Sequence, residues 1–97
     1  MHFDWDEGKN NANVHKHGLD FTDAWEVFEL PMLIIRDNRA DYGEERWAGL
    51  GILGNRIVKV VFTEPDEITI RIISLRKALK YEREEFEQAF KNRLGTR

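Results

Sequence analysis

Alternating apolar and polar positions predict β-strands in the second half of this chain. Residues 68–76 are rich in β-branched apolar side chains, which favour a central strand. Strict alternation places one set of side chains on the first face of this strand: Ile68, Ile70, Ile72, Ser74 and Arg76. The second face then carries Thr69, Arg71, Ile73 and Leu75. The strand therefore begins in the core and ends with cations and a hydroxyl.

Shorter patterns predict four more strands, at residues 2–6, 32–35, 45–53 and 56–63. The first is an edge strand or an extended arm, and the second is a buried strand. Gly54-Asn55 is a two-residue hairpin turn, and Pro65-Asp66 turns the chain into the last strand. Residues 36–44 form a charged loop. The last three strands thus form an antiparallel meander.

Three helices are predicted, at residues 7–17, 21–29 and 78–93. Asp6 and Asp20 are suited to cap the first two, and Gly18 to end the first. The first helix gathers a polar face from Lys9, Asn13, Lys16 and His17. The second carries an apolar stripe of Phe21, Ala24, Trp25 and Phe28. The closing helix turns inward Leu79, Phe86, Ala89, Phe90 and Leu94.

The order of these elements predicts an α+β fold. Two N-terminal helices precede a curled, mainly antiparallel sheet, and one C-terminal helix closes it. The 97 residues suit a single domain with one core. The acidic N-terminus lacks the pattern of a signal peptide, and no apolar run is long enough to span a bilayer. We therefore expect a cytoplasmic protein without a membrane partner.

Charge is distributed unevenly along the chain. The net charge is −3, yet residues 1–70 hold 7 Lys or Arg against 14 Asp or Glu, whereas residues 71–97 hold 8 against 4. This asymmetry predicts two surfaces with different partners, although a solvated helix face would give the same counts.

Several chemistries find little support in these residues. The chain has no Cys, which excludes disulfides and thiolate chemistry. His15 and His17 are two positions apart on a helix and point in different directions, so we expect no metal site and no cofactor. Ser74, the single serine, lacks the sequence context of a nucleophile.

The remaining candidates are cations and hydrogen-bonding groups: Lys9, Lys16, His17, Arg46, Arg71, Ser74, Arg76 and Lys77, with Tyr81 as a base-stacking residue. Such a set suits metal-free RNA cleavage, in which the ribose 2′-hydroxyl is the attacking group. The protein then supplies cations for the phosphate and a group that transfers protons, for which His17 is suited near neutral pH. This interpretation requires the arginines of residues 68–76 to face an open hollow instead of neutralising buried acids. The alternative is a non-catalytic interaction module whose cations bind an acidic partner protein.

Several spaced motifs resemble the BrnT family of toxins from type II toxin–antitoxin systems. They include Trp5-Asp6-x-x-Lys9, Lys16-His17-Gly18, Glu45-Arg46, Val60-Val61-Phe62-Thr63-Glu64, Arg71-Ile72-Ile73-Ser74-x-Arg76 and Glu82-Arg83. They occur in matching order from about residue 3 to residue 86.

The resemblance implies a RelE-like fold and a metal-independent endoribonuclease that cleaves RNA and inhibits translation and growth. It also implies a BrnA-like ribbon-helix-helix antitoxin, with operator DNA bound only through the complex. The residues that match the family motifs are Lys16, His17, Arg46, Arg71, Ser74 and Arg76. From their chemistry we assign catalytic roles to His17, Arg71, Arg76, Lys16 and Arg46, and RNA binding to Lys9, Ser74, Lys77 and Tyr81.

Two positions depart from the family pattern. Pro65 stands where an arginine is common, which removes a possible phosphate contact. Leu75 replaces the usual alanine and would add bulk beside the site. Both changes predict a weakened toxin.

Overall fold

The computed structural model describes residues 1–39 and 43–93. The elements are β1 (His2–Trp5), α1 (Glu7–His17), the 3-10 helix η1 (Phe21–Glu29), β2 (Leu33–Arg36), β3 (Trp47–Leu53), β4 (Arg56–Asp66), β5 (Thr69–Lys77) and α2 (Lys80–Arg93). Five strands form one sheet in the order β1-β5-β4-β3-β2. The β1–β5 pair is parallel, and the other three pairs are antiparallel. The α+β class and the meander of the last three strands are therefore confirmed.

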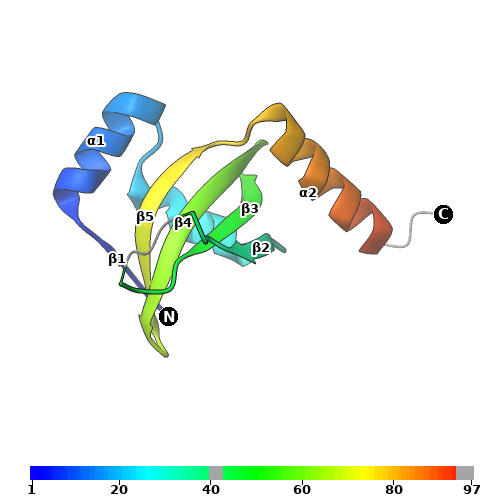
Figure 1. Cartoon of the computed structure of the whole chain (residues 1–97). Coiled ribbons are helices and arrows are strands. Elements are labelled where there is room, and N and C mark those ends of the chain that lie inside the picture. Colours follow the sequence, from blue (N-terminus) through cyan, green and yellow to red (C-terminus); the bar gives the residue numbers. More distant parts are fainter. Residues whose placement is uncertain (40–42, 94–97) are drawn as a thin grey trace.

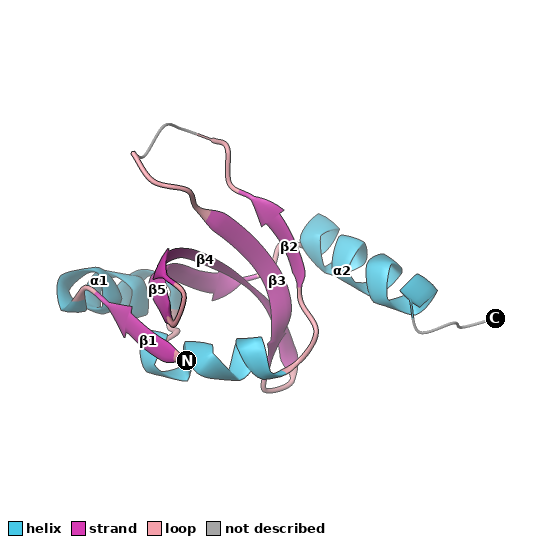
Figure 2. Cartoon of the chain, turned by 90° about the horizontal axis from the view of Figure 1, so that it is seen from below, coloured by secondary structure: helices cyan, strands magenta, loops and turns pink. Residues whose placement is uncertain are grey.

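The helices cover the two faces of the sheet unequally (Figures 1 and 2). The main core lies between η1 and one sheet face and includes Phe21, Val27, Val60, Ile72 and Leu75. A smaller cluster on the opposite face joins α2 to β3, with Phe86 of α2 packed near Leu50 and Ala78. Much of that second face beside β5 is left uncovered by helices, which is where a site can form.

The end signals of the first two helices work as the sequence predicts. Asp6 accepts a hydrogen bond from the Lys9 N–H at 2.9 Å, and Asp20 accepts one from the Thr22 N–H at 2.9 Å. Gly18 ends α1 in the left-handed region with φ 72°, where its N–H donates to the Val14 carbonyl. These local contacts need no tertiary structure, which is why the sequence alone locates them.

The apolar stripe predicted for η1 is partly wrong because this helix is of the 3-10 type. Its buried residues are Phe21, Ala24 and Val27, which repeat every three positions. Trp25, which an α-helical period would turn inward, is instead 49% exposed. Close approach of η1 to β3 also explains Gly51, where a Cβ would lie 2.7 Å from a Val27 methyl carbon.

Helix α1 is attached to the sheet through buried asparagines. The Asn13 amide donates to the Leu75 carbonyl at 2.8 Å and accepts from the Leu75 N–H at 3.1 Å. Asn10 accepts from the Phe21 N–H and donates to Asp20. Asn13 thus completes the hydrogen bonding of the Leu75 backbone groups at the edge of β5, beyond the end of β1. Because its side chain is buried, Asn13 is not part of a solvent-facing surface with Lys9, Lys16 and His17.

Two further expectations about burial are wrong. The strand expected to be buried is the edge strand β2, where Ile35 is 63% exposed. Leu79 is 51% exposed because α2 begins only at Lys80, so Leu79 lies ahead of the helix. Leu94 and residues 40–42 of the predicted loop lie outside the described residues.

Candidate active site

An irregular register in β5 determines which side chains share a face. Phe62 of β4 pairs with Ile72, but Val61 pairs with Ser74, so Ile73 is an extra residue. The extra residue reverses the alternation. Arg71, Ser74 and Arg76 therefore share the face opposite the main core, and the strict alternation predicted from the sequence is wrong.

The same reversal changes the interpretation of Leu75. Its side chain is fully buried in the main core, next to the helices, and so it lies on the face opposite the arginines. The expectation that Leu75 adds bulk beside the site is therefore wrong. Pro65 lies in the irregular end of β4, where its missing N–H does not interrupt a regular ladder.

Arg71 lies at the surface beside an open pocket. Its Nε donates to Asp4 Oδ1 at 3.0 Å, and the two side chains are 48% and 35% exposed. The hydrogen bond from Arg71 and the charge of Asp4 raise the pKa of the guanidinium above its usual value. The pocket measures about 440 Å³, and its wall contains Lys9 and Arg71 together with the carboxylates of Asp4, Asp6 and Glu44. Ion pairs this exposed are weak, so Arg71 can exchange Asp4 for another anion.

Arg76 has a different environment from Arg71. Its two terminal nitrogens donate to the two oxygens of Glu82 at 2.8 and 2.9 Å. Glu82 is buried, accepts from the Leu79 N–H at 2.8 Å, and lies 3.8 Å from Lys59. Burial raises the pKa of Glu82, but hydrogen bonds from Arg76 and the Leu79 N–H outweigh it and leave the pKa below its usual value. Arg76 is thus held in an internal ion pair.

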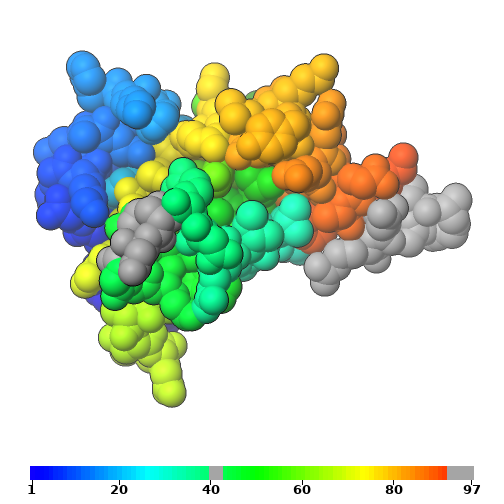
Figure 3. Space-filling model, in the orientation of Figure 1, coloured from blue at the N-terminus to red at the C-terminus, as the bar shows by residue number. Residues whose placement is uncertain are grey.

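His17 is the last residue of α1 and lies near Arg76, close to the C-terminal end of β5. Partial burial lowers the pKa of His17, and the positive charges of Lys16 and Arg76 lower it further. A lowered pKa leaves the imidazole neutral at pH 7, the form that accepts a proton. In the space-filling view, the yellow end of β5 reaches the surface between α1 and the start of α2 (Figure 3).

Arg46 directly precedes β3, near the charged groups around Arg71. Arg46 Nε lies 3.4 Å from Glu44, and Thr63 of β4 is paired with Arg71 of β5. Arg71 is in turn paired with Asp4 of β1. Glu44 is a residue that the sequence analysis did not select, and it lies in the wall of the Arg71 pocket.

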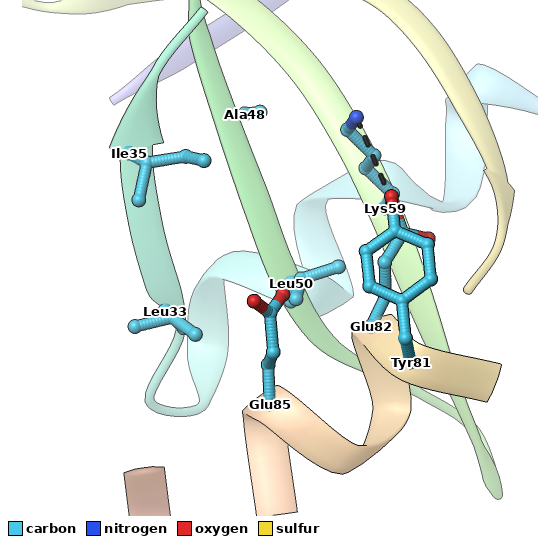
Figure 4. Close-up of a pocket in the computed structure, with 8 residues that line it drawn as sticks. All are labelled: Leu33, Ile35, Ala48, Leu50, Lys59, Tyr81, Glu82 and Glu85. Atoms are coloured by element: carbon cyan, nitrogen blue, oxygen red, sulfur yellow. Dashed lines mark ion pairs between the residues drawn. The ribbon is translucent and has the colours of Figure 1, made fainter. Parts of the chain in front are cut away.

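The predicted site residues divide into separate groups. Lys9 and Arg71 share the 440 Å³ pocket, while Tyr81 lies in the wall of a second pocket of 320 Å³. Figure 4 shows this second pocket, in which Tyr81 and Glu82 of α2 lie opposite Leu33 and Ile35 of β2. Lys16 and Lys77 are exposed, and Ser74 is half-buried.

The residues that the structure describes also bear on cofactors and membranes. Within residues 1–39 and 43–93, no group of three or more His, Cys, Asp or Glu is arranged to hold a metal ion. None of the helices in this part of the chain is long and apolar enough to cross a membrane.

Comparisons with known proteins identify the class. A family model described as the ribonuclease toxin BrnT of type II toxin–antitoxin systems matches residues 5–82. The crystal structure of the Brucella abortus ribonuclease toxin, BrnT, is 33% identical, with 82% of this chain and 99% of that chain covered and a TM-score of 0.67. The comparison with curated proteins found no significant match. Fold and motifs thus define a ribonuclease toxin of the type II toxin–antitoxin class. The chain belongs to the BrnT family, as the motif resemblance indicates.

Proposed function

We propose that this ribonuclease toxin is a metal-independent endoribonuclease whose cleavage of RNA inhibits translation and growth. The observation that carries the proposal is Arg71, half-exposed and weakly paired beside a 440 Å³ pocket that Lys9 also lines. Such a guanidinium can bind a phosphate with two parallel hydrogen bonds. The cations that the sequence selects are thus, in part, available to RNA.

In the proposed reaction, the ribose 2′-oxygen bonds to the adjacent phosphorus to form a 2′,3′-cyclic phosphate, and the bond to the 5′-oxygen of the next nucleotide breaks, with that oxygen taking a proton from water. Arg71 leaves Asp4 and holds an RNA phosphate at its end of β5. Near the other end of β5, neutral His17 accepts the 2′-hydroxyl proton, and Lys16 beside it stabilises the charge that develops on the scissile phosphate. Ser74 lies between Arg71 and Arg76 on the same sheet face and is suited to hydrogen-bond the RNA, as are the exposed Lys9 and Lys77.

The roles of two residues change in this proposal. Arg76 becomes a positioning residue, because its guanidinium is occupied by Glu82 and its charge acts on His17 from nearby. Tyr81 is 59% exposed and remains a candidate for base stacking, at the rim of the second pocket. Arg46 assists from beside Glu44, which lies in the wall of the Arg71 pocket.

The proposal extends to partners. A toxin of this class implies an antitoxin, which we expect to be a BrnA-like ribbon-helix-helix protein that binds operator DNA together with the toxin. The RelE-like relationship of the fold and the cytoplasmic location also remain predictions. An adjacent gene for a small ribbon-helix-helix protein would support the partner assignment.

The alternative, a non-catalytic module that binds an acidic partner, has one observation in its favour. Both β5 arginines already contact carboxylates, Asp4 and Glu82, as they would contact an acidic protein. This alternative predicts no RNA cleavage and no effect on growth when the chain is expressed alone.

The test measures cleavage of single-stranded RNA by the purified protein in EDTA. We expect cleavage by the wild type and a loss of about 10²-fold in kcat/KM for Arg71→Ala, the size expected when charge-assisted hydrogen bonds to a phosphate are lost. The control is Arg56→Ala, the same change at an exposed residue at the start of β4. Equal cleavage by the Arg71 variant would refute its role, and no cleavage by the wild type would favour the interaction module.

A further inference from the structure

A third pocket lies next to the Arg71 pocket and has a different chemistry. It measures 240 Å³, and its wall contains Trp47, Thr63, Pro65 and three glutamates, Glu44, Glu45 and Glu64. Glu44 also lies in the wall of the Arg71 pocket, so the two pockets are neighbours. In Figure 3 the green residues that lead into β3 lie beside the lime residues of β4. Pockets for drug-sized ligands measure about 300–1,000 Å³, so this one suits a smaller, ring-sized group.

Thr63 is the feature that points to a ligand. It is 3% exposed, and its Oγ1 has no hydrogen-bond partner within the part of the chain that the structure describes. A buried hydroxyl without a partner is rare in native proteins because it forfeits its hydrogen bonds to water. Thr63 is therefore suited to complete its hydrogen bonding with a bound group.

The glutamates of this pocket determine what that group can be. Glu45 forms an ion pair with Arg36, and Glu44 forms one with Arg46. The carboxylate of Glu64 has no ion pair or hydrogen bond with another described residue. Unlike the Arg71 pocket, this pocket has no Lys or Arg among its described lining residues to offset its glutamates, so it suits an uncharged group that offers donors. Trp47 and Pro65 add apolar surface of the kind that contacts a flat ring.

We infer that this pocket binds the base of a guanine nucleotide next to the phosphate held by Arg71. On one edge, guanine presents two adjacent N–H donors, from N1 and N2, beside the acceptor O6. The Glu64 carboxylate accepts from both donors, and Thr63 Oγ1 donates to O6. Adenine, cytosine and uracil each lack the two adjacent donors. The inference rests on the proposed function and adds a base preference to it.

The test compares binding and cleavage of short single-stranded RNAs that differ at one base. For binding, the oligonucleotides carry 2′-deoxy substitutions that prevent cleavage, and fluorescence anisotropy gives the Kd. We expect guanine to be preferred by roughly 5- to 150-fold, the range for a bidentate contact between a side chain and a base. Inosine, which lacks the N2 amino group, should lose most of this preference.

Two variants examine the residues assigned to the base. Glu64→Gln should abolish the preference for guanine, whereas Glu67→Gln, the same change at an exposed residue in the β4–β5 turn, should retain it. Thr63→Val should weaken guanine binding yet melt at a higher temperature than the wild type, because it removes a buried hydroxyl without a partner. Thr63→Ser should restore binding.

The outcomes separate this inference from the proposed function. Cleavage without base preference would overturn the guanine pocket and leave the ribonuclease proposal intact. Guanine-selective binding without cleavage would support the pocket and count against the proposed catalytic roles. A Thr63→Val variant that melts lower and binds guanine normally would show that the hydroxyl serves the fold.

Discussion

Two arginines on one strand face differ in what holds them. Arg71 contacts the half-exposed Asp4, so water competes for both groups. Arg76 contacts the buried Glu82 through two hydrogen bonds, and Lys59 adds a third charge to that group. A buried pair is costly to break because it leaves an uncompensated charge. The exchangeable guanidinium is therefore Arg71, although both residues occur in one motif.

The protonation of His17 provides the pH dependence of cleavage. Its pKa lies below the ordinary 6.5, so we expect kcat/KM to be constant above that pH and to fall in more acidic solution as the imidazole gains a proton. His17→Gln should lower the rate by about 10²–10⁴-fold and remove this acidic decline. The measurement is a pH–rate profile between pH 5 and 8.

The control for this profile is His15→Gln, an exposed histidine on the same helix. It should retain both the rate and the decline in acid. An unchanged profile in the His17 variant would assign proton transfer to another group, for which Glu44 in the wall of the Arg71 pocket is placed.

At the scale of elements, α2 depends on a few contacts with the sheet. Phe86 and Phe90 pack near Leu50, and Glu82 joins the first turn of α2 to β4 and β5 through Lys59 and Arg76. The same carboxylate accepts from the Leu79 N–H and so caps the helix start. The orientation of α2 therefore depends on the ionised form of one side chain.

Glu82→Gln should lower the free energy of unfolding by about 1–3 kcal/mol at pH 7, less than for a fully buried pair because both cations are partly exposed. The folded-state pKa of Glu82 is lowered, so its contribution is present above the unfolded pKa near 4.5 and is lost as the pH falls through the folded pKa. The difference between wild type and variant should shrink below pH 4.5. Urea unfolding at several pH values measures it.

Glu84→Gln is the matched control, since Glu84 is exposed on the same helix. It should change stability little at any pH. A Glu82 variant as stable as the wild type at pH 7 would contradict the assigned role of this carboxylate.

For the molecule as a whole, an acidic body carries a small number of exposed cations near β5. The exposed cations assigned to RNA in the proposed reaction are Lys9, Lys16, Arg71 and Lys77. Each phosphate contact on a single strand contributes about 0.7 to the slope of log K against log salt. RNA binding should therefore depend on salt only moderately for a nucleic-acid enzyme.

Four such contacts predict a slope of about −3 for binding to a non-cleavable single-stranded RNA. Lys9→Ala should make the slope less steep by about 0.7, whereas Lys80→Ala, an exposed lysine at the start of α2, should leave it unchanged. Fluorescence anisotropy titrations at several salt concentrations measure it. A slope near zero would show that these cations do not contact phosphates.

The sequence by itself determined the features that depend on neighbours along the chain. Asp6, Gly18 and Asp20 bound the helices through contacts within a few residues, and the alternation around Gly54 specified the hairpin of β3 and β4. Several motifs in one order also determined the BrnT family, because their combined spacing is specific.

Only the tertiary structure decided which of these side chains meet. The extra residue Ile73 reversed the faces of β5 through its pairing with β4, and no local pattern indicates such an irregularity. The partner of Arg71 is Asp4 of β1, which lies 67 residues away along the chain. The partner of Arg76 is Glu82 of α2, the helix that follows β5. The unpartnered hydroxyl of Thr63 is likewise a property of burial, which depends on every element packed around it.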